Sequence, residues 1–206
     1  LLFSLSLSAM TAFMVGIAIH GFRAENLKIT NHTLRNEKRW TTSGRVFLGI
    51  TIVWFVFVGH CGVVQAYTYV GNRAFEATEV GAWAYRRNEP LPASNQAATR
   101  RAVNAFESAE SLAMFSDFRY AARLSGLAMV QKKYQTAIDQ MQRATRIDPS
   151  YASNHSDLAG ILGFMGRHED ALAALAPAIE LAPENLQFQT QKLVMASNAR
   201  DLKGRA

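Results

Sequence analysis

The sequence predicts an all-α protein in which two transmembrane helices are followed by a short helical solenoid. Charge is the first observation behind this prediction: residues 1–67 carry six basic and two acidic side chains, all between Arg23 and Arg45. The second observation is a repeat of small and apolar residues in residues 68–206, with a fixed period. The overall net charge of +6 and the hydrophobic fraction of 49% therefore describe neither region. This division excludes a single water-soluble core.

Two charge-free stretches, at about 1–19 and 46–66, are long enough to cross a bilayer. A helix of 19 residues is about 28 Å long, which is close to the thickness of the hydrocarbon core. The first stretch has no basic segment before it and no small-residue cleavage site after it, which excludes a signal peptide. It also begins without an initiator Met, so we expect further residues before Leu1.

The segment between the two stretches, residues 20–45, is predicted to be a short basic loop with six Lys or Arg and two Glu. Short loops rich in Lys and Arg remain in the cytoplasm, where their cations attract anionic lipid headgroups. Residues 68–206 would then lie on the outer side, in the periplasm if the membrane is a bacterial inner membrane. The alternative is that spans before Leu1 set the topology and the charge bias is incidental.

Small residues recur in both predicted spans at a spacing that lets a second helix approach closely. Either the two spans pack on each other through these residues, or they dock onto a larger membrane partner. The residues are Ser4, Ser8, Ala12 and Gly16 in the first span, and Gly59 and Gly62 in the second.

Self-similarity in the second region is the strongest pattern in the chain. Leu124, Ala137, Ala144 and Pro149 recur at one fixed spacing as Leu158, Ala171, Ala178 and Pro183. The spacing of about 34 residues and the residue types resemble the tetratricopeptide repeat (TPR) family. The unit of that family is a helix pair with small residues at the crossing and a closing Pro.

The resemblance implies repeats at 118–151 and 152–185. We expect flanking helices at 95–113 and 186–203 to complete a domain of residues 95–206, behind a neck or linker at 68–94. Two positions depart from the family pattern. Lys132 occupies the turn position that Gly166 fills in the second repeat, and Pro177 lies inside a predicted helix, which it should kink.

In the TPR family the first helix of each pair lines a concave groove, so the resemblance implies a groove that binds protein. Arg119 is the only charged residue at the matching positions, which favours an apolar segment or another subunit over a charged peptide tail. The positions are Arg119, Ala122, Gly126, Met129, Val130, Ser153, Ser156, Gly160, Gly163 and Phe164.

No pattern in the sequence indicates catalysis, a metal site or a cofactor. A phosphate-binding Gly-rich loop, a His-Glu-x-x-His motif and a nucleophile elbow are all missing. Cys61 is the single cysteine, which excludes an internal disulfide. His60, inside the second span, could ligate a haem or chlorophyll-type metal, although a hydrogen bond to a neighbouring helix is the simpler interpretation. His155 and His168 fall on packing positions of the repeat.

These observations predict a non-enzymatic, membrane-anchored TPR scaffold that docks to, or helps assemble, a larger membrane complex. Its partners would be protein subunits and the bilayer. Nucleic acid is excluded because the second region is nearly neutral. The alternative is the C-terminal portion of a larger polytopic membrane enzyme, a glycosyltransferase or a ferredoxin-like electron-transfer protein with a TPR tail.

Overall fold

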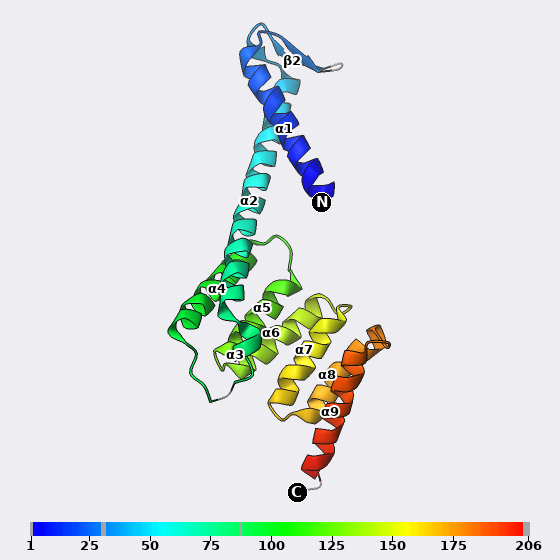
Figure 1. Ribbon diagram of the computed structural model, residues 1–206. Helices are drawn as coiled ribbons and strands as arrows, with labels where there is room; N and C mark the ends of the chain where they lie inside the picture. The colour runs from blue at the N-terminus through cyan, green and yellow to red at the C-terminus, as the bar shows by residue number, and fades with distance from the viewer. Residues whose placement is uncertain (1, 30–31, 87, 204–206) are drawn as a thin grey trace. The chain divides into compact units, whose positions relative to one another are not determined.

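The computed structural model describes residues 2–29, 32–86 and 88–203, most of them in helices (Figure 1). The chain divides into two compact units, residues 1–63 and 64–206. This boundary lies close to the one that the charge distribution predicts. The mostly helical class is confirmed, but the first unit also contains a small sheet that the sequence analysis did not predict.

The first unit consists of helix α1 (Leu2–Arg23), three short strands and the first part of helix α2 (Thr42–Thr78). The strands β1 (Leu27–Ile29), β2 (His32–Asn36) and β3 (Arg39–Trp40) form an antiparallel sheet in the order β1-β2-β3. In the register, Leu27 and Trp40 both lie opposite Arg35.

The sheet corrects the prediction of a loop at residues 20–45 and of an all-α fold. Its second turn is built by Glu37 and Lys38, whose φ angles of 47° and 64° are left-handed. Such a turn matches the twist of a hairpin but normally carries Asn or Gly, so these residues present no recognisable turn pattern. The sheet also packs on the start of α2, where a Cβ at Gly44 would lie 2.0 Å from the carbonyl oxygen of Leu34.

Among the described residues, α2 is the one helix long and apolar enough to cross a membrane. It contains the predicted span at 46–66. Only 6% of the residues in its most apolar stretch are buried. The predicted span at 1–19 falls on α1. Because the side chains of residues 1–9 are not described, that span stays a prediction.

Side chains join α1 to α2 at two points. Trp54 Nε1 donates a hydrogen bond of 3.2 Å to the hydroxyl of Thr11. The hydroxyl of Thr51 lies 3.6 Å from the sulfur of Met14, and both residues are buried.

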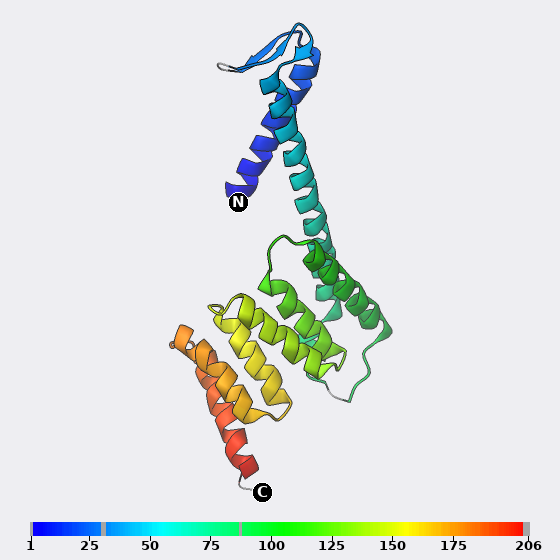
Figure 2. The ribbon, with the colours of Figure 1, turned by 180° about the vertical axis from the view of Figure 1, so that it is seen from behind.

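The second unit contains the end of α2, α3 (Val80–Trp83), α4 (Ala93–Leu112) and five further helices (Figures 1 and 2). These five are α5 (Phe118–Val130), α6 (Tyr134–Ile147), α7 (Ala152–Phe164), α8 (His168–Leu181) and α9 (Leu186–Lys203). The first residues of α5, α7 and α9 are separated by exactly one sequence period each, so the period is also structural. The pairs α5/α6 and α7/α8 correspond to the two predicted repeats.

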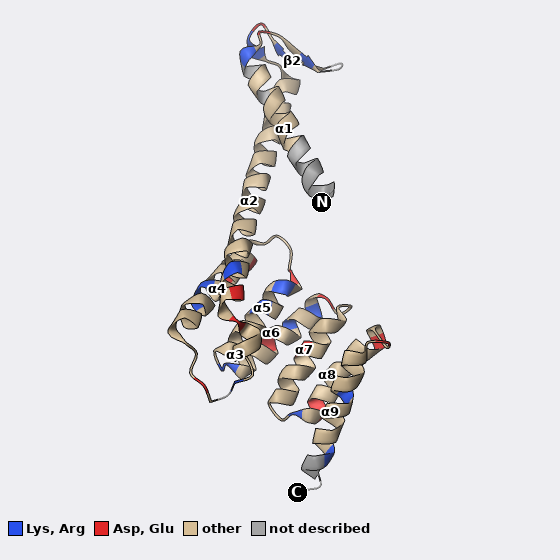
Figure 3. Cartoon of the chain, viewed as in Figure 1, with Lys and Arg blue, Asp and Glu red and all other residues tan. Residues whose placement is uncertain are grey.

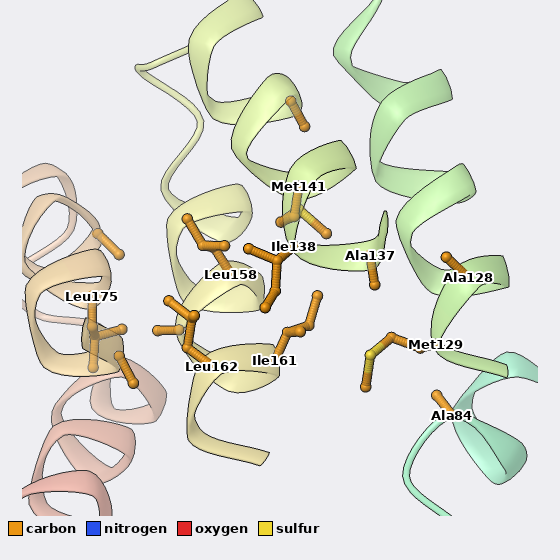
Figure 4. Close-up of a cluster of buried hydrophobic side chains, with 14 of the residues drawn as sticks. Ala84, Ala128, Met129, Ala137, Ile138, Met141, Leu158, Ile161, Leu162 and Leu175 are labelled. Carbon is orange, nitrogen blue, oxygen red and sulfur yellow. The ribbon is translucent and has the colours of Figure 1, made fainter. Parts of the chain in front are cut away.

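The small residues of the repeat lie where the helices cross, and all four of them are 0% exposed: Ala137, Ala144, Ala171 and Ala178. Met141 and Leu175 fill the large positions between them, at 4% and 0% exposure (Figure 4). Alanine at a crossing allows the helix axes to approach closely, so that the larger side chains of neighbouring helices interdigitate. The predicted packing pattern is confirmed.

The turns within the two repeats share one backbone conformation. Gly166 has a φ of +79°, and Lys132 at the matching position has a φ of 63°. A left-handed conformation is unfavourable for a residue with a Cβ. Lys132 nevertheless makes contacts that glycine could not, because its ammonium donates to the backbone carbonyls of Trp83 and Arg86. In the second repeat, Pro177 lies inside α8, which continues to Leu181.

The segment expected to be a neck or linker, residues 68–94, is largely built into the second unit. Gly71 of α2 meets the ring of Phe106 in α4, and Thr78 at the end of α2 is 0% exposed. Glu79, with a φ of 53°, separates α2 from α3.

Helix α9 takes the place of the first helix of a third pair and is the last helix that the structure describes. Leu124 of α5 and Leu158 of α7 are buried at the same position of the repeat. The equivalent residue of α9, one further period along the chain, is Lys192, which is exposed. A charged residue there gives the last helix a face that can contact water.

Candidate protein-binding groove

The first half of the predicted groove, on α5, is covered by the chain itself. A Cβ at Gly126 would lie 3.2 Å from Val80 and 3.7 Å from Phe75. Met129 and Val130 are each 2% exposed and belong to the core, so neither offers surface to a partner. The end of α2 and the short helix α3 thus occupy the concave side of the first repeat.

Aromatic rings mark the limit of this covered region. The ring of Tyr85, just after α3, stands edge-on to the ring of Phe164 at 5.3 Å, and Phe164 contacts Tyr134 at 5.7 Å. Phe164 was predicted to line the groove, but its ring packs against the rings of Tyr85 and Tyr134.

The second half of the concave side, between α7 and α9, is open. It forms a hollow of about 510 Å³ with Tyr85 along one edge. Of the ten predicted groove residues, two line this hollow, Ser156 and Gly160. Its other lining residues are Tyr85, Asp157, Leu186, Gln187, Thr190 and Gln191.

A pair of reciprocal hydrogen bonds fixes the floor of the hollow. The hydroxyl of Ser156 donates to Oε1 of Gln191 over 2.7 Å, and Nε2 of Gln191 donates to the backbone carbonyl of Ser156 over 3.0 Å. These bonds hold α9 against α7. Gly160 leaves room beside them, since a Cβ there would lie 3.6 Å from Nε2 of Gln191.

Asp157 and Tyr85 give the hollow its electrostatic character. Asp157 is an exposed residue of α7, and partial burial of its carboxylate raises its pKa above the usual value. Burial also raises the pKa of Tyr85, and the negative charge of Asp157 raises it further. The hollow therefore carries one carboxylate beside a phenol.

The remaining predicted groove residues lie outside the open hollow. Arg119 forms an ion pair with Asp117 over 2.7 Å, and Asp117 in turn caps α5 by accepting from the Arg119 backbone N–H. Ser153 is exposed and Ala122 is half-buried. A Cβ at Gly163 would lie 3.3 Å from the terminal carbon of Met195 in α9.

Two lining residues that were not predicted follow from the repeat period. Adding one more repeat period to Ser153 and Ser156 gives Gln187 and Thr190, both of which line the hollow. Tyr85 could not have been found this way, because it comes from a segment outside the repeats.

In the first unit, the small residues predicted to pack helices remain free of close neighbours. A Cβ built at Gly16, Gly59 or Gly62 would meet no described atom within 4 Å, and Ala12 is exposed. The side chains of Ser4 and Ser8 lie outside the described residues.

No group of three His, Cys, Asp or Glu residues that could hold a metal occurs in the described part of the chain. His60 is half-buried, and its Nε2 has no hydrogen-bond partner among the described residues. Cys61 is a half-buried free thiol. His155 bonds to the backbone carbonyl of Pro149 over 3.0 Å, as expected for a packing residue, and His168 is half-buried at the start of α8.

Comparison with known proteins finds similarity at the level of the fold alone. Two crystal structures of MamA protein superpose on the chain, each with a TM-score of 0.46. The first is 18% identical and covers 70% of this chain and 75% of its own. The second is 19% identical and covers 68% of this chain and 78% of its own. No protein-family model and no curated protein matches the chain.

The second unit has a TPR-like helical repeat fold. Its helix pairs, their period and their buried alanines establish this.

Proposed function

We propose that this protein is a membrane-anchored scaffold that binds a protein partner through the hollow between α7 and α9 and so docks to a larger membrane complex. The open hollow is the observation that carries this proposal. In the described repeats, the rest of the concave side is already covered by α3 and by Tyr85. A partner segment therefore meets α7 and α9 first.

The lining of the hollow indicates the chemistry of the partner. Thr190, Gln187 and Asp157 contribute hydroxyl, amide and carboxylate groups to the lining, and Leu186 and Tyr85 contribute apolar surface. Such a surface suits an extended or helical segment that carries a Lys or Arg, because a cation would pair with the partly desolvated Asp157 carboxylate. The apolar part of such a segment, which the sequence favours as the ligand, would lie against Leu186 and Tyr85.

Membrane anchoring is supported by the length and apolar character of α2, with α1 as the second proposed span. The cations around the sheet suit anionic headgroups on the cytoplasmic side, which would leave the repeats on the outer side, in the periplasm of a bacterial cell. The open surface at Gly16, Gly59 and Gly62 offers another membrane helix a close approach.

Binding, as opposed to catalysis, is the role that the groups of the hollow favour. Ser156 is engaged with Gln191, and no described base lies within hydrogen-bonding distance to activate its hydroxyl. We therefore propose a protein without enzymatic activity.

Copurification of partners with the full chain from its native membranes tests the proposal. Asp157→Asn removes the charge, and Gly160→Leu fills the hollow without a clash at its Cβ. A lost charge-assisted hydrogen bond weakens binding by about 10-fold or more. We expect both variants to lose the partner, and Asp139→Asn, at an exposed site on α6, to retain it.

A chain lacking residues 118–206 completes the test. It should insert into membranes but retain no partner. Partners that still copurify with it, or with Gly160→Leu at the level of the unchanged protein, would show that the hollow is not the binding surface.

A further inference from the structure

A second hollow lies within the first unit, where α1, the sheet and α2 meet, and its volume is about 510 Å³. Most of its lining is apolar. Phe13 and Ile17 come from α1, Leu34 comes from β2, and Val46 and Ile50 come from α2. Phe13, Val46 and Ile50 are each more than half exposed, so the hollow opens outward and no described residue fills it.

The polar residues of this hollow all lie at one end. His32 begins β2, and Thr42 and Ser43 begin α2. From Ser43 to Ile50 the axis of α2 advances about 10 Å. Along α2 the lining therefore changes from polar at Thr42 and Ser43 to apolar at Val46 and Ile50, while on the sheet the apolar Ile29 lies opposite His32.

Lys and Arg residues gather in and beside the sheet (Figure 3). Arg23, Lys28, Arg39 and Arg45 are all exposed, and none of them is paired with an acidic side chain among the described residues. Lys38 is paired with Glu25 over 2.8 Å. An excess of positive charge thus lies beside an apolar hollow whose entrance carries hydrogen-bonding groups.

We propose that this hollow binds one anionic phospholipid. An acyl chain would lie between α1 and α2 against Ile17, Leu34 and Val46. The phosphate would lie at the polar end, within reach of the His32, Thr42 and Ser43 side chains, and the surrounding cations would select a negatively charged headgroup. The inference rests on the proposed membrane anchoring, and it adds a defined lipid site to the general attraction of a basic loop for headgroups.

Retention of lipid tests the site. The full chain is reconstituted in mixed phosphatidylcholine and phosphatidylglycerol vesicles, extracted in a mild detergent and weighed intact by native mass spectrometry. We expect one phosphatidylglycerol per chain. Val46→Trp places an indole in the hollow and should abolish this adduct, whereas Val53→Trp should keep it. Val53 is the matched control because it lies on the same helix, is 69% exposed against 59% for Val46, and does not line the hollow.

The charge requirement is tested separately. Each Lys or Arg near a membrane surface contributes about 1 kcal/mol, so Arg45→Gln should lower the preference for phosphatidylglycerol over phosphatidylcholine about 5-fold. Arg200→Gln, on α9 in the second unit, should leave it unchanged.

The outcomes separate this inference from the proposed function. Equal retention of lipid by Val46→Trp and Val53→Trp, at unchanged helical content, would overturn the lipid site while the anchored scaffold stands. Release of the unchanged chain from vesicles by alkaline carbonate would overturn the membrane anchoring, and the lipid site with it.

Discussion

Gly71 offers a sharp test of how α2 enters the second unit. A Cβ at this position would lie 2.7 Å and 2.8 Å from two ring carbons of Phe106. That ring cannot move aside easily, because it is 1% exposed and lies edge-on to Phe75 at 6.3 Å. Helix propensity alone gives no reason to keep glycine here, since Ala stabilises an unconstrained helix position by about 1 kcal/mol relative to Gly.

Gly71→Ala therefore sets two effects against each other. The gain in helix propensity is about 1 kcal/mol, and overpacking a rigid core costs about 1–3 kcal/mol, which leaves a net destabilisation of up to about 2 kcal/mol. For a unit of this size the melting temperature falls by about 3 °C per kcal/mol. Gly81→Ala is the control, because a Cβ there meets no described atom within 4 Å.

Thermal unfolding of the full chain in detergent, followed by circular dichroism, measures both variants. We expect Gly71→Ala to lower the melting temperature and Gly81→Ala to leave it unchanged or raise it. Phe106→Leu should cost less in the Gly71→Ala background than alone, because the smaller side chain makes room for the added methyl group. A melting temperature that rises for Gly71→Ala as it does for Gly81→Ala would refute the close approach of α2 to α4.

Three further predictions concern the repeats, and the same measurement of unfolding checks them. Leu175→Ala, at 0% exposure, should cost about 2–5 kcal/mol, while Leu193→Ala, at 72%, should cost no more than about 0.5 kcal/mol. Pro177→Ala should stabilise α8 by up to about 3 kcal/mol, because it restores a backbone hydrogen bond within the helix. Asp117→Ala should cost about 1 kcal/mol at neutral pH through loss of the α5 cap. Burial raises the pKa of Asp117, but the side-chain and backbone hydrogen bonds from Arg119 and its charge outweigh burial and lower it. The stability that this carboxylate contributes is therefore present above about pH 4 and lost below it, and the difference between the two proteins should shrink in acid.

The repeats were predictable because their packing depends on local spacing. Ala137 and Ala171 lie at helix crossings whose geometry recurs once per repeat, so one sequence pattern encodes both. The same period shows where α9 departs from the repeat, since the exposed Lys192 stands where the repeats have a buried leucine. A contact that recurs in each repeat is therefore encoded at more than one place in the sequence.

The sheet and the covered half of the groove were not predictable for the opposite reason. The turn at Glu37 and Lys38 adopts left-handed angles without the residues that usually favour them. The contact of Val80 with Gly126 joins positions far apart in the sequence and occurs once. A single long-range contact leaves no periodic pattern, so Met129 and Val130 were assigned to the surface although they lie in the core.

The position of α3 on the first repeat has a thermodynamic consequence for any partner. A segment that ran along the whole concave side would have to compete with α3 for the surface at Gly126. Its apparent affinity would equal its intrinsic affinity multiplied by the fraction of molecules in which α3 is undocked. If undocking costs about 2 kcal/mol, the reduction is about 30-fold. Short ligands at α7 and α9 would escape this competition, so under the proposed function the chain would discriminate between partners by their length as well as by their side chains.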